Sequence, residues 1–277
     1  MRDAILKRIS TRTFTKETLA KNQIKEIKQL LAKYANIQGP FGNSFEFTFD
    51  LNEDESKKGQ KIGTYGLIKN VPAFIGGIAK NNRESLIDFG YVFEMIILEL
   101  TKLDYATCWL GGTFKRKDYR RGLNKDEVIP AISPIGFRAE KRSIVDRTLR
   151  SAAQSHKRLP FGELFHYFDT NQELEEAKDS RFVDIMQLVR KAPSASNKQP
   201  WRIFVTKDHD AVHVYLKRNK LYGSALSYDI QLLDIGISLA HLEVGLNHYD
   251  FSYDTSVLEE GVFFDGLEYV MSYTKHK

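Results

Sequence analysis

The sequence has a single cysteine, Cys108, and only seven prolines among its 277 residues. One thiol cannot form a disulfide within the chain and supplies too few sulfur ligands for a cysteine-based metal site, which excludes a disulfide-stapled mini-protein. The scarcity of proline argues against a proline-rich disordered chain. This cysteine usage fits a reducing compartment, so we expect a cytoplasmic protein.

Long hydrophobic runs are also missing. The most apolar stretch, residues 91–100, is interrupted by Glu94 and Glu99, whereas a membrane-spanning helix needs about 20 predominantly apolar residues. The first eight residues contain no apolar core of signal-peptide length. We therefore expect neither a spanning helix nor an export signal.

What the chain does contain is enough apolar material for a large core. Hydrophobic residues make up 42% of the sequence and aromatic residues 12%, which indicates a folded protein. At roughly 150 residues per domain, the length corresponds to one large domain or two small ones.

Positive charge is unevenly distributed. The net charge is +5, but residues 115–158 hold thirteen Lys and Arg against five Asp and Glu. Such a stretch favours an anionic partner, which could be a nucleic acid, a membrane surface or a phosphate-bearing small molecule. Composition does not choose among them, and a basic nucleic-acid-binding module stays an alternative although no nucleic-acid motif is recognisable.

Hydrophobic periodicity predicts alternating helices and strands. Helices are expected over residues 16–35, 86–103, 182–189 and 230–246, and strands over 45–51, 71–79, 105–110, 132–137, 201–206, 211–217 and 267–274. Asn124, with Glu127 three residues later, predicts a further short capped helix. The helix over 86–103 is apolar around most of its circumference, so we expect it at the centre of the fold.

Two short patterns recur 146 residues apart. Asp88-Phe89-Gly90 matches Asp234-Ile235-Gly236, and Asp104-Tyr105 matches Asp250-Phe251 at the same offset. A fixed offset of this kind indicates an internal repeat. We therefore predict two similar halves packed around a pseudo-two-fold axis.

The N-terminal segment carries a candidate anion site. Residues i, i+2 and i+4 of an extended segment point the same way, so Arg8, Ser10 and Arg12 would converge on one side. Two guanidinium groups and a hydroxyl suit the oxygens of a phosphate. The alternative is an exposed basic terminus without a ligand.

A second candidate is the loop over residues 191–201, in which two prolines bracket small hydroxyl and amide residues. Such a loop between a helix and a strand suits a flat heteroaromatic ligand, because it offers hydrogen-bonding groups with little bulk. The alternative is an ordinary rigid turn in which Ser194 and Asn197 satisfy backbone groups.

Other polar residues give weaker signals. His209 and His213 lie four apart but in a predicted turn and strand without a neighbouring cysteine, so no metal site is expected. His241 on an apolar helix is interpreted as a core histidine, and Cys108 as a small buried residue. No catalytic acid or base is assigned.

Two motifs carry a family resemblance. Residues 8–14 resemble the Arg-x-Ser-x-Arg-x-Phe element of the nitroreductase family of flavin enzymes, and residues 192–201 resemble its Ala-Pro-Ser-x-x-Asn-x-Gln-Pro-Trp loop almost letter for letter. Residues 107–112, 134–137 and 157–160 resemble further elements of that family. The order departs from the usual pattern, because residues 38–43 stand where the proline-rich loop usually follows the N-terminal helix. The chain is thus similar to a fused pseudo-dimer, like the single-chain thermophile-type nitroreductases, with one of two sites retained.

The resemblance implies an α+β, nitroreductase-like fold with two similar sheet-and-helix halves, residues 1–155 and 156–277, forming an intramolecular pseudo-dimer. It implies an FMN-dependent oxidoreductase that uses NAD(P)H to reduce a nitroaromatic, quinone or similar small acceptor, as a monomer or a dimer. A flavin-binding protein without turnover stays an alternative. Carried over residue by residue, the phosphate would be held by Arg8, Ser10, Arg12, Arg158 and Lys157, the ring edge and ribityl chain by Pro193, Ser194, Ala195 and Asn197, and the reactive ring nitrogen would face the backbone of Leu110, Gly111 and Gly112.

Overall fold

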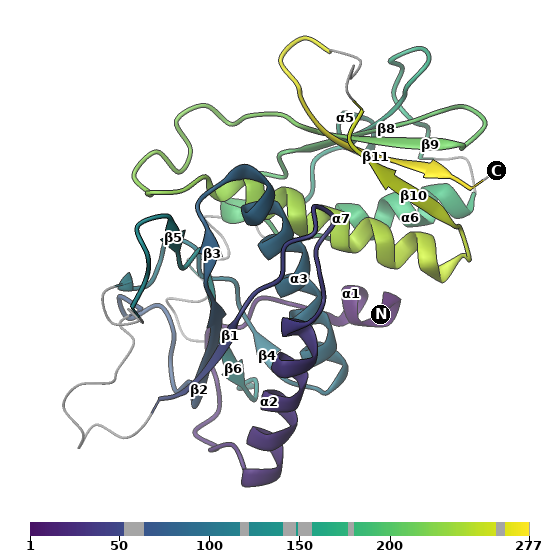
Figure 1. Cartoon of the computed structure of the whole chain (residues 1–277). Helices are drawn as coiled ribbons and strands as arrows, with labels where there is room; N and C mark the ends of the chain where they lie inside the picture. The colour runs from purple at the N-terminus through teal and green to yellow at the C-terminus, as the bar shows by residue number, and fades with distance from the viewer. Residues whose placement is uncertain are drawn as a thin grey trace.

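The computed structural model describes residues 1–52, 64–116, 122–140, 148, 157–176, 180–258 and 264–276. Two sheets, each accompanied by helices, lie on either side of a central helix pair, α3 (Arg83–Lys102) and α7 (Ile230–His248) (Figure 1). The expected α+β class with two sheet-and-helix halves is confirmed. In the described ranges, no helix is both long and apolar enough to cross a bilayer.

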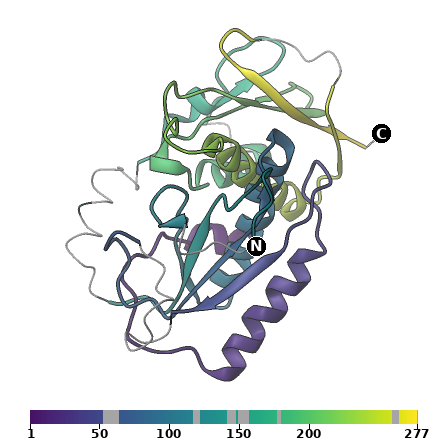
Figure 2. The same cartoon turned by 60° about the vertical axis from the view of Figure 1, so that its left-hand side comes forward.

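The first half contains an antiparallel four-stranded sheet in the order β1-β2-β6-β4. Helix α2 packs along β1 and against α3, at the end of the molecule farthest from the second sheet (Figure 2). A two-stranded ribbon of β3 and β5 lies beside it. The elements are α1 (Arg2–Lys7), α2 (Lys21–Ala35), β1 (Phe47–Leu51), β2 (Ala73–Gly77), β3 (Ala79–Lys80), β4 (Ala106–Thr107), β5 (Glu127–Val128) and β6 (Ile132–Gly136).

The second half contains a five-stranded sheet in the order β10-β11-β9-β8-β7, in which only the β7–β8 pair is parallel. Helices α6 and α7 pack beneath it (Figure 1). The elements are α5 (Phe161–Leu164), β7 (Phe165–Tyr167), α6 (Arg181–Arg190), β8 (Trp201–Val205), β9 (Ala211–Leu216), β10 (Tyr253–Ser256) and β11 (Glu268–Lys275).

The two halves repeat each other in topology. The order β1-β2-β6-β4 matches β8-β9-β11-β10, and each second strand leads into a central helix. Both central helices end in the same way. Asp104 and Asp250 have φ of 64° and 55°, and the next residue donates its N–H back into the helix, from Tyr105 to Leu100 at 2.9 Å and from Phe251 to Leu246 at 3.0 Å. These are Schellman-type ends, so the predicted 146-residue repeat is confirmed.

The predicted capped helix at Asn124 is wrong. The side chain of Glu127 does accept the N–H of Asn124 at 2.9 Å, as in a capping box, but Glu127 and Val128 then form strand β5. Pro130 follows closely, and proline disfavours helical geometry in the residue before it and lacks an N–H. A local cap is therefore present without a helix to follow it.

Other differences are smaller. The helix expected from residue 16 begins at Lys21, and of the strand expected over 105–110 only Ala106–Thr107 is regular. Helices α1 and α5 and strands β7 and β10 were not predicted. The expected boundary between residues 155 and 156 lies outside the described residues, as does much of the basic stretch over 115–158.

Candidate functional site

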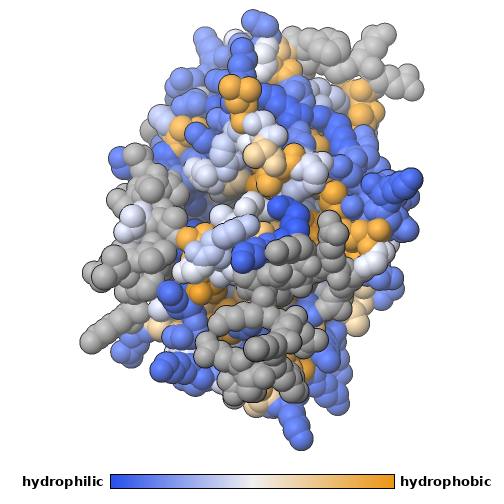
Figure 3. Space-filling model, turned by 90° about the vertical axis from the view of Figure 1, so that its left-hand side faces the viewer, coloured by the Kyte–Doolittle hydropathy of each residue, from blue (hydrophilic) through white to orange (hydrophobic). Residues whose placement is uncertain are grey.

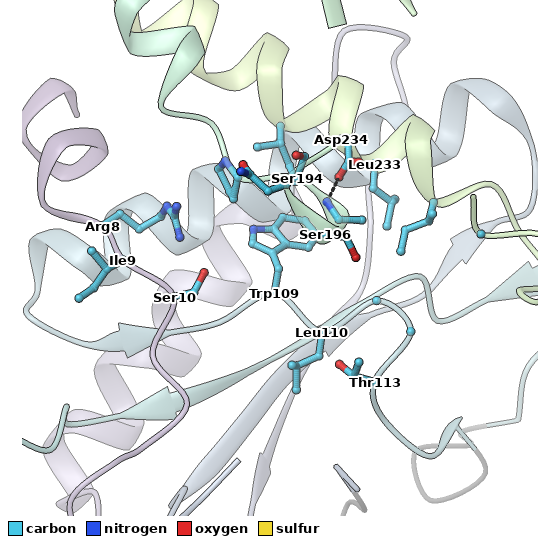
Figure 4. A pocket seen from close by; sticks show the side chains of 18 of the residues that line it. Arg8, Ile9, Ser10, Trp109, Leu110, Thr113, Ser194, Ser196, Leu233 and Asp234 are labelled. Carbon is cyan, nitrogen blue, oxygen red and sulfur yellow. Dashed lines mark hydrogen bonds between the residues drawn. The ribbon is translucent and has the colours of Figure 1, made fainter. Parts of the chain in front are cut away.

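A cavity of about 620 Å³ lies where the two halves meet, a volume typical of small-molecule and cofactor sites. Figure 4 shows side chains from both halves pointing into it. In the space-filling view of the side that faces left in Figure 1, hydrophobic residues gather near the middle between hydrophilic ones (Figure 3).

The structure brings nearly all the sequence-predicted residues to this one cavity. It is lined by Arg8, Ser10, Arg12, Leu110, Gly111, Gly112, Arg158, Pro193, Ser194, Ala195 and Asn197. Lys157 instead lines an adjoining hollow, which Arg158 and Asn197 also border. Residues far apart in sequence thus share one site.

The N-terminal segment is fixed beside the first sheet by its backbone. Helix α1 ends at Lys7, and Arg8 is already extended, with ψ of 129°. Ser10 bridges Thr107 of β4 in parallel fashion, and the carbonyl of Arg12 accepts the N–H of Lys69 at 2.9 Å. The extended geometry expected for this segment is therefore present, and Figure 4 shows Arg8 and Ser10 facing the cavity.

Arg158 adds a cation from the second half, near Arg8. Its Nε donates to the carbonyl of Arg190 at 2.7 Å and its Nη1 to Asn197 Oδ1 at 3.2 Å. Burial, and then the positive charges of Arg8 and Arg190, lower the pKa of Arg158 to about 10. A cation destabilised by other cations is stabilised when an anion binds among them, so this end of the cavity suits a negatively charged group.

A buried network around Glu94 fixes the side chain of Arg8. The side chain of Glu94 is fully buried and lies 3.6 Å from Arg8 Nε. It also accepts hydrogen bonds from Trp109 Nε1 at 2.6 Å and from His241 Nε2 at 3.0 Å. His241 Nδ1 faces the carbonyl of Leu188 at 2.9 Å. Both ring nitrogens of His241 thus face acceptor oxygens, so the imidazole is held between Glu94 and the backbone of Leu188.

The proline-rich loop is both a rigid turn and a cavity wall. Ser194 Oγ accepts the N–H of Gln199 at 2.9 Å, and Asn197 Nδ2 donates to the carbonyl of Lys157 at 2.9 Å. Ser196 and Asn197 have φ of 48° and 58°, in the left-handed region that asparagine tolerates better than most residues. The side chain of Ser194 thus fixes the loop's own backbone, and that of Asn197 ties the loop to residues 157 and 158, while both residues border the cavity.

Asp234 anchors this loop to helix α7. Its Oδ1 accepts the N–H of Ala195 at 2.9 Å, as the dashed line in Figure 4 shows, while Oδ2 has no hydrogen-bond partner within the described ranges of the chain. Burial raises the pKa of Asp234 well above its ordinary value. Its counterpart in the first half, Asp88, accepts the N–H groups of Phe41 and Asn43. The same residue therefore anchors the corresponding loop in each half.

The turn after β4 has a fixed carbonyl. Gly111 O accepts a hydrogen bond from Arg116 and lies 3.0 Å from Tyr228 Oη, whose single proton has a nearer acceptor in the carbonyl of Pro130 at 2.6 Å. Burial raises the pKa of Tyr228 to about 12, so this hydroxyl remains a donor at neutral pH. Among the described residues, the N–H groups of Gly111 and Gly112 donate to no protein acceptor. The turn can therefore offer backbone donors to a ligand.

Much of the apolar lining of the cavity was not predicted from the sequence. Trp109 meets the ring of Phe93 edge-on at 4.9 Å, and it stands directly before the predicted Leu110. The loop between β9 and α7 had no signal in the sequence, yet Tyr222 Oη donates to Ser196 Oγ at 2.8 Å. Further lining comes from Ile5, Leu6, Ile9, Leu67, Thr113, Lys191, Gly223, Leu226, Ile230, Leu233 and Ile237.

The remaining polar candidates lie elsewhere. His209 stacks on Phe182, and His213 Nδ1 lies 2.6 Å from Ser272 Oγ. In the described part of the chain, no group of three or more His, Cys, Asp or Glu residues could hold a metal ion. Cys108 is buried in the core as expected.

The fold and the cavity between its halves define a nitroreductase-like protein, and comparison of the sequence with protein families agrees. The model of a family described as "Putative TM nitroreductase" matches residues 1–246. The chain belongs to this nitroreductase family. No match was found among curated protein sequences.

Similar proteins are also found among solved structures, and one of them shares the fold along nearly the whole chain. A "putative nitroreductase" of Thermotoga maritima is 18% identical over 99% of this chain and 93% of its own, with a TM-score of 0.61. A nitroreductase family protein of Clostridium difficile is 15% identical over 59% of this chain and 95% of its own, with a TM-score of 0.39. A Bacteroides fragilis nitroreductase with bound FMN is 17% identical over 51% of this chain and 90% of its own, with a TM-score of 0.37.

Proposed function

We propose that the cavity binds FMN and that the protein is an NAD(P)H-dependent oxidoreductase acting on small acceptors. The observation that carries the proposal is the polarity of the cavity. Arg8, Arg12 and Arg158 line the cavity, and the charges of Arg8 and Arg158 are close enough to interact, while Trp109, Leu226 and other apolar residues also line it. A ligand with a phosphate on one end and a flat ring on the other matches this distribution.

The phosphate of FMN suits the hydrogen-bond donors that the chain offers in the cavity. Phosphate carries close to two negative charges near neutral pH, and each hydrogen bond between charged groups contributes about 1.5–3 kcal/mol. Arg8, Ser10, Arg12 and Arg158 would hold this group. Glu94 keeps the buried Arg8 side chain in place, and Lys157 adds positive charge from the adjoining hollow.

The ring of FMN suits the part of the cavity between the proline-rich loop and the turn at Gly111 and Gly112. Pro193 and Ala195 offer small side chains and backbone groups from the second half, while Gly111 and Gly112 offer N–H groups from the first. Apolar walls keep water away from this part of the cavity. Bound here, FMN supplies the chemistry that carries a hydride from NAD(P)H to a nitroaromatic, quinone or similar acceptor. The residues orient the partners, and no side chain is needed as an acid or a base.

Two measurements test the proposal. Titration of the protein with FMN should quench flavin fluorescence with one equivalent bound per chain. The loaded protein should then oxidise NADH or NADPH only when a quinone or nitroaromatic is present. Binding without such turnover would favour the flavin-binding alternative, and failure to take up FMN would contradict the proposal. The cytoplasmic location and the monomeric or dimeric state stay predictions.

A further inference from the structure

A second hollow, of about 540 Å³, adjoins the main cavity and shares Arg158, Ser196 and Asn197 with it. We call it the basic hollow because positive side chains dominate its wall. It is lined by Lys157, Arg158, Leu159, Pro160, Glu163, Ser196, Asn197, Lys198, Gln199, Arg202, Lys217, Arg218 and Asn219.

Two of its arginines are already neutralised. Arg202 Nη2 contacts Glu163, the single carboxylate in the described wall, at 2.8 Å. Arg218 binds Glu268 at 2.7 Å and also contacts Asp229. These pairs stiffen the wall but add little net charge.

Its lysines are not neutralised. Among the described residues, no carboxylate lies within 4 Å of the ammonium groups of Lys157, Lys198 and Lys217. Lys217 directly follows β9, and its N–H donates to the carbonyl of Pro200 at 2.7 Å, so it lies at the same end of the sheet as Lys198. Together with Arg158, the three lysines form a cluster of positive charge that attracts anions.

The backbone places this cluster next to the main cavity. Asn197 and Ser196 separate the two spaces, and Asn197 bonds to both Arg158 and the carbonyl of Lys157. In the proposed function, Arg8, Ser10, Arg12 and Arg158 hold the flavin phosphate from the main cavity. Lys157 adds positive charge to that phosphate from the hollow, whereas Lys198 and Lys217 are in excess of what the phosphate needs.

We propose that the basic hollow binds a phosphate monoester of the electron donor, the 2′-phosphate that distinguishes NADPH from NADH. Lys198 and Lys217 provide point charges for this dianion, while the nicotinamide end of the same molecule enters the main cavity. The proposal rests on the proposed function, because it assumes a dinucleotide donor. It makes Lys198 and Lys217 specificity-determining residues for NADPH over NADH.

The test is calorimetric titration of the FMN-loaded protein with NADP⁺, NAD⁺, adenosine 2′,5′-bisphosphate and AMP. We expect NADP⁺ and the bisphosphate to bind at least tenfold more tightly than NAD⁺ and AMP. In the Lys198→Glu/Lys217→Glu variant this preference should disappear, while NAD⁺ affinity stays within twofold. The control Lys25→Glu/Lys207→Glu makes the same change in net charge at exposed positions and should keep the preference.

Equal binding of NADP⁺ and NAD⁺ to the parent protein would overturn the proposal, as would a preference that survives charge reversal. A companion titration of the flavin-free protein with FMN and FAD identifies the source of the phosphate. Tighter binding of FAD than of FMN by the parent protein, but not by the Lys198→Glu/Lys217→Glu variant, would mean that the hollow binds part of the flavin cofactor. In that case its assignment to the 2′-phosphate of NADPH is wrong. If the parent protein does not bind FMN at all, the proposed function itself is contradicted.

Discussion

Gly236 of α7 packs directly on Gly90 of α3. A Cβ atom at Gly236 would lie 2.9 Å from the Cα of Gly90 and 2.6 Å from the N of Tyr91, and closer still to the carbonyl oxygen of Ile87. These are backbone atoms and cannot rotate away. The two glycines, which the sequence places 146 positions apart, therefore allow the central helices of the two halves to touch.

Replacing Gly236 with Ala should push these helices apart. We expect the free energy of unfolding to fall by about 1–3 kcal/mol, the range for overpacking in a core, despite alanine's better helix propensity. Urea denaturation followed by circular dichroism measures the change. Asn247→Ala, at an exposed site on the same helix, should shift stability by less than about 0.5 kcal/mol. Equal stability of both variants would rule out close contact of the helices.

Glu94 should be coupled to His241. Glu94 also forms a buried ion pair with Arg8. Removing one partner of such a pair leaves the charge of the other uncompensated and typically costs about 3–5 kcal/mol, so Glu94→Gln should destabilise the protein strongly. The tryptophan fluorescence should also change, because Trp109 loses a charged acceptor. In the double variant with His241→Met, the second change should cost less than it does in the parent protein. Strictly additive effects would contradict the network.

Asp234 should make stability depend on pH. Burial raises the pKa of this carboxyl in the folded state, so folding favours its protonated form. That stabilisation is complete below the pKa of the unfolded chain and is lost as pH rises toward the folded pKa. Relative to Asp234→Asn, the parent protein should lose about 1.4 kcal/mol per pH unit above pH 4 within that window. A constant difference between the two proteins from pH 4 to 7 would refute this assignment.

Asn197 should act on the phosphate end through Arg158, because its side chain contacts Arg158 and the carbonyl of Lys157. We expect Asn197→Ala to weaken FMN binding about tenfold but to change riboflavin binding less than threefold, since riboflavin lacks the phosphate. Fluorescence titration gives both affinities. Equal losses for the two flavins would indicate that Asn197 serves the ring instead.

The sequence predicted the large elements well, because their periodicity matches their burial. Helix α7 is apolar on all sides, and in the structure it is covered by α3, α6 and the second sheet. Short elements such as β7 depend on partner strands that come from elsewhere in the chain, here β8, so local patterns do not reveal them. The helix predicted from the capping pattern of Asn124 and Glu127 was wrong for the same reason, because Glu127 and Val128 pair with strand β3.

The candidate site was predictable where polar residues form dense motifs. Arg8, Ser10 and the loop around Ser194 all reach the cavity. The apolar and ionic support of that site was not predictable, because Trp109, Glu94 and His241 come together only when α3 packs against α7. Tyr222 lies in an irregular loop whose course is set by contacts with Ser196 and with α7.

The central claim, that residues near the N-terminus hold the phosphate of a flavin, is tested most directly by the Arg8→Ala/Arg12→Ala variant. Its dissociation constants for FMN and riboflavin should be compared with those of the parent protein and of Lys21→Ala/Lys25→Ala, a control at exposed positions of α2. We predict that the arginine variant binds FMN at least tenfold more weakly, a loss of at least about 1.4 kcal/mol, while riboflavin binding is nearly unchanged. An FMN affinity equal to that of the parent protein would contradict the account.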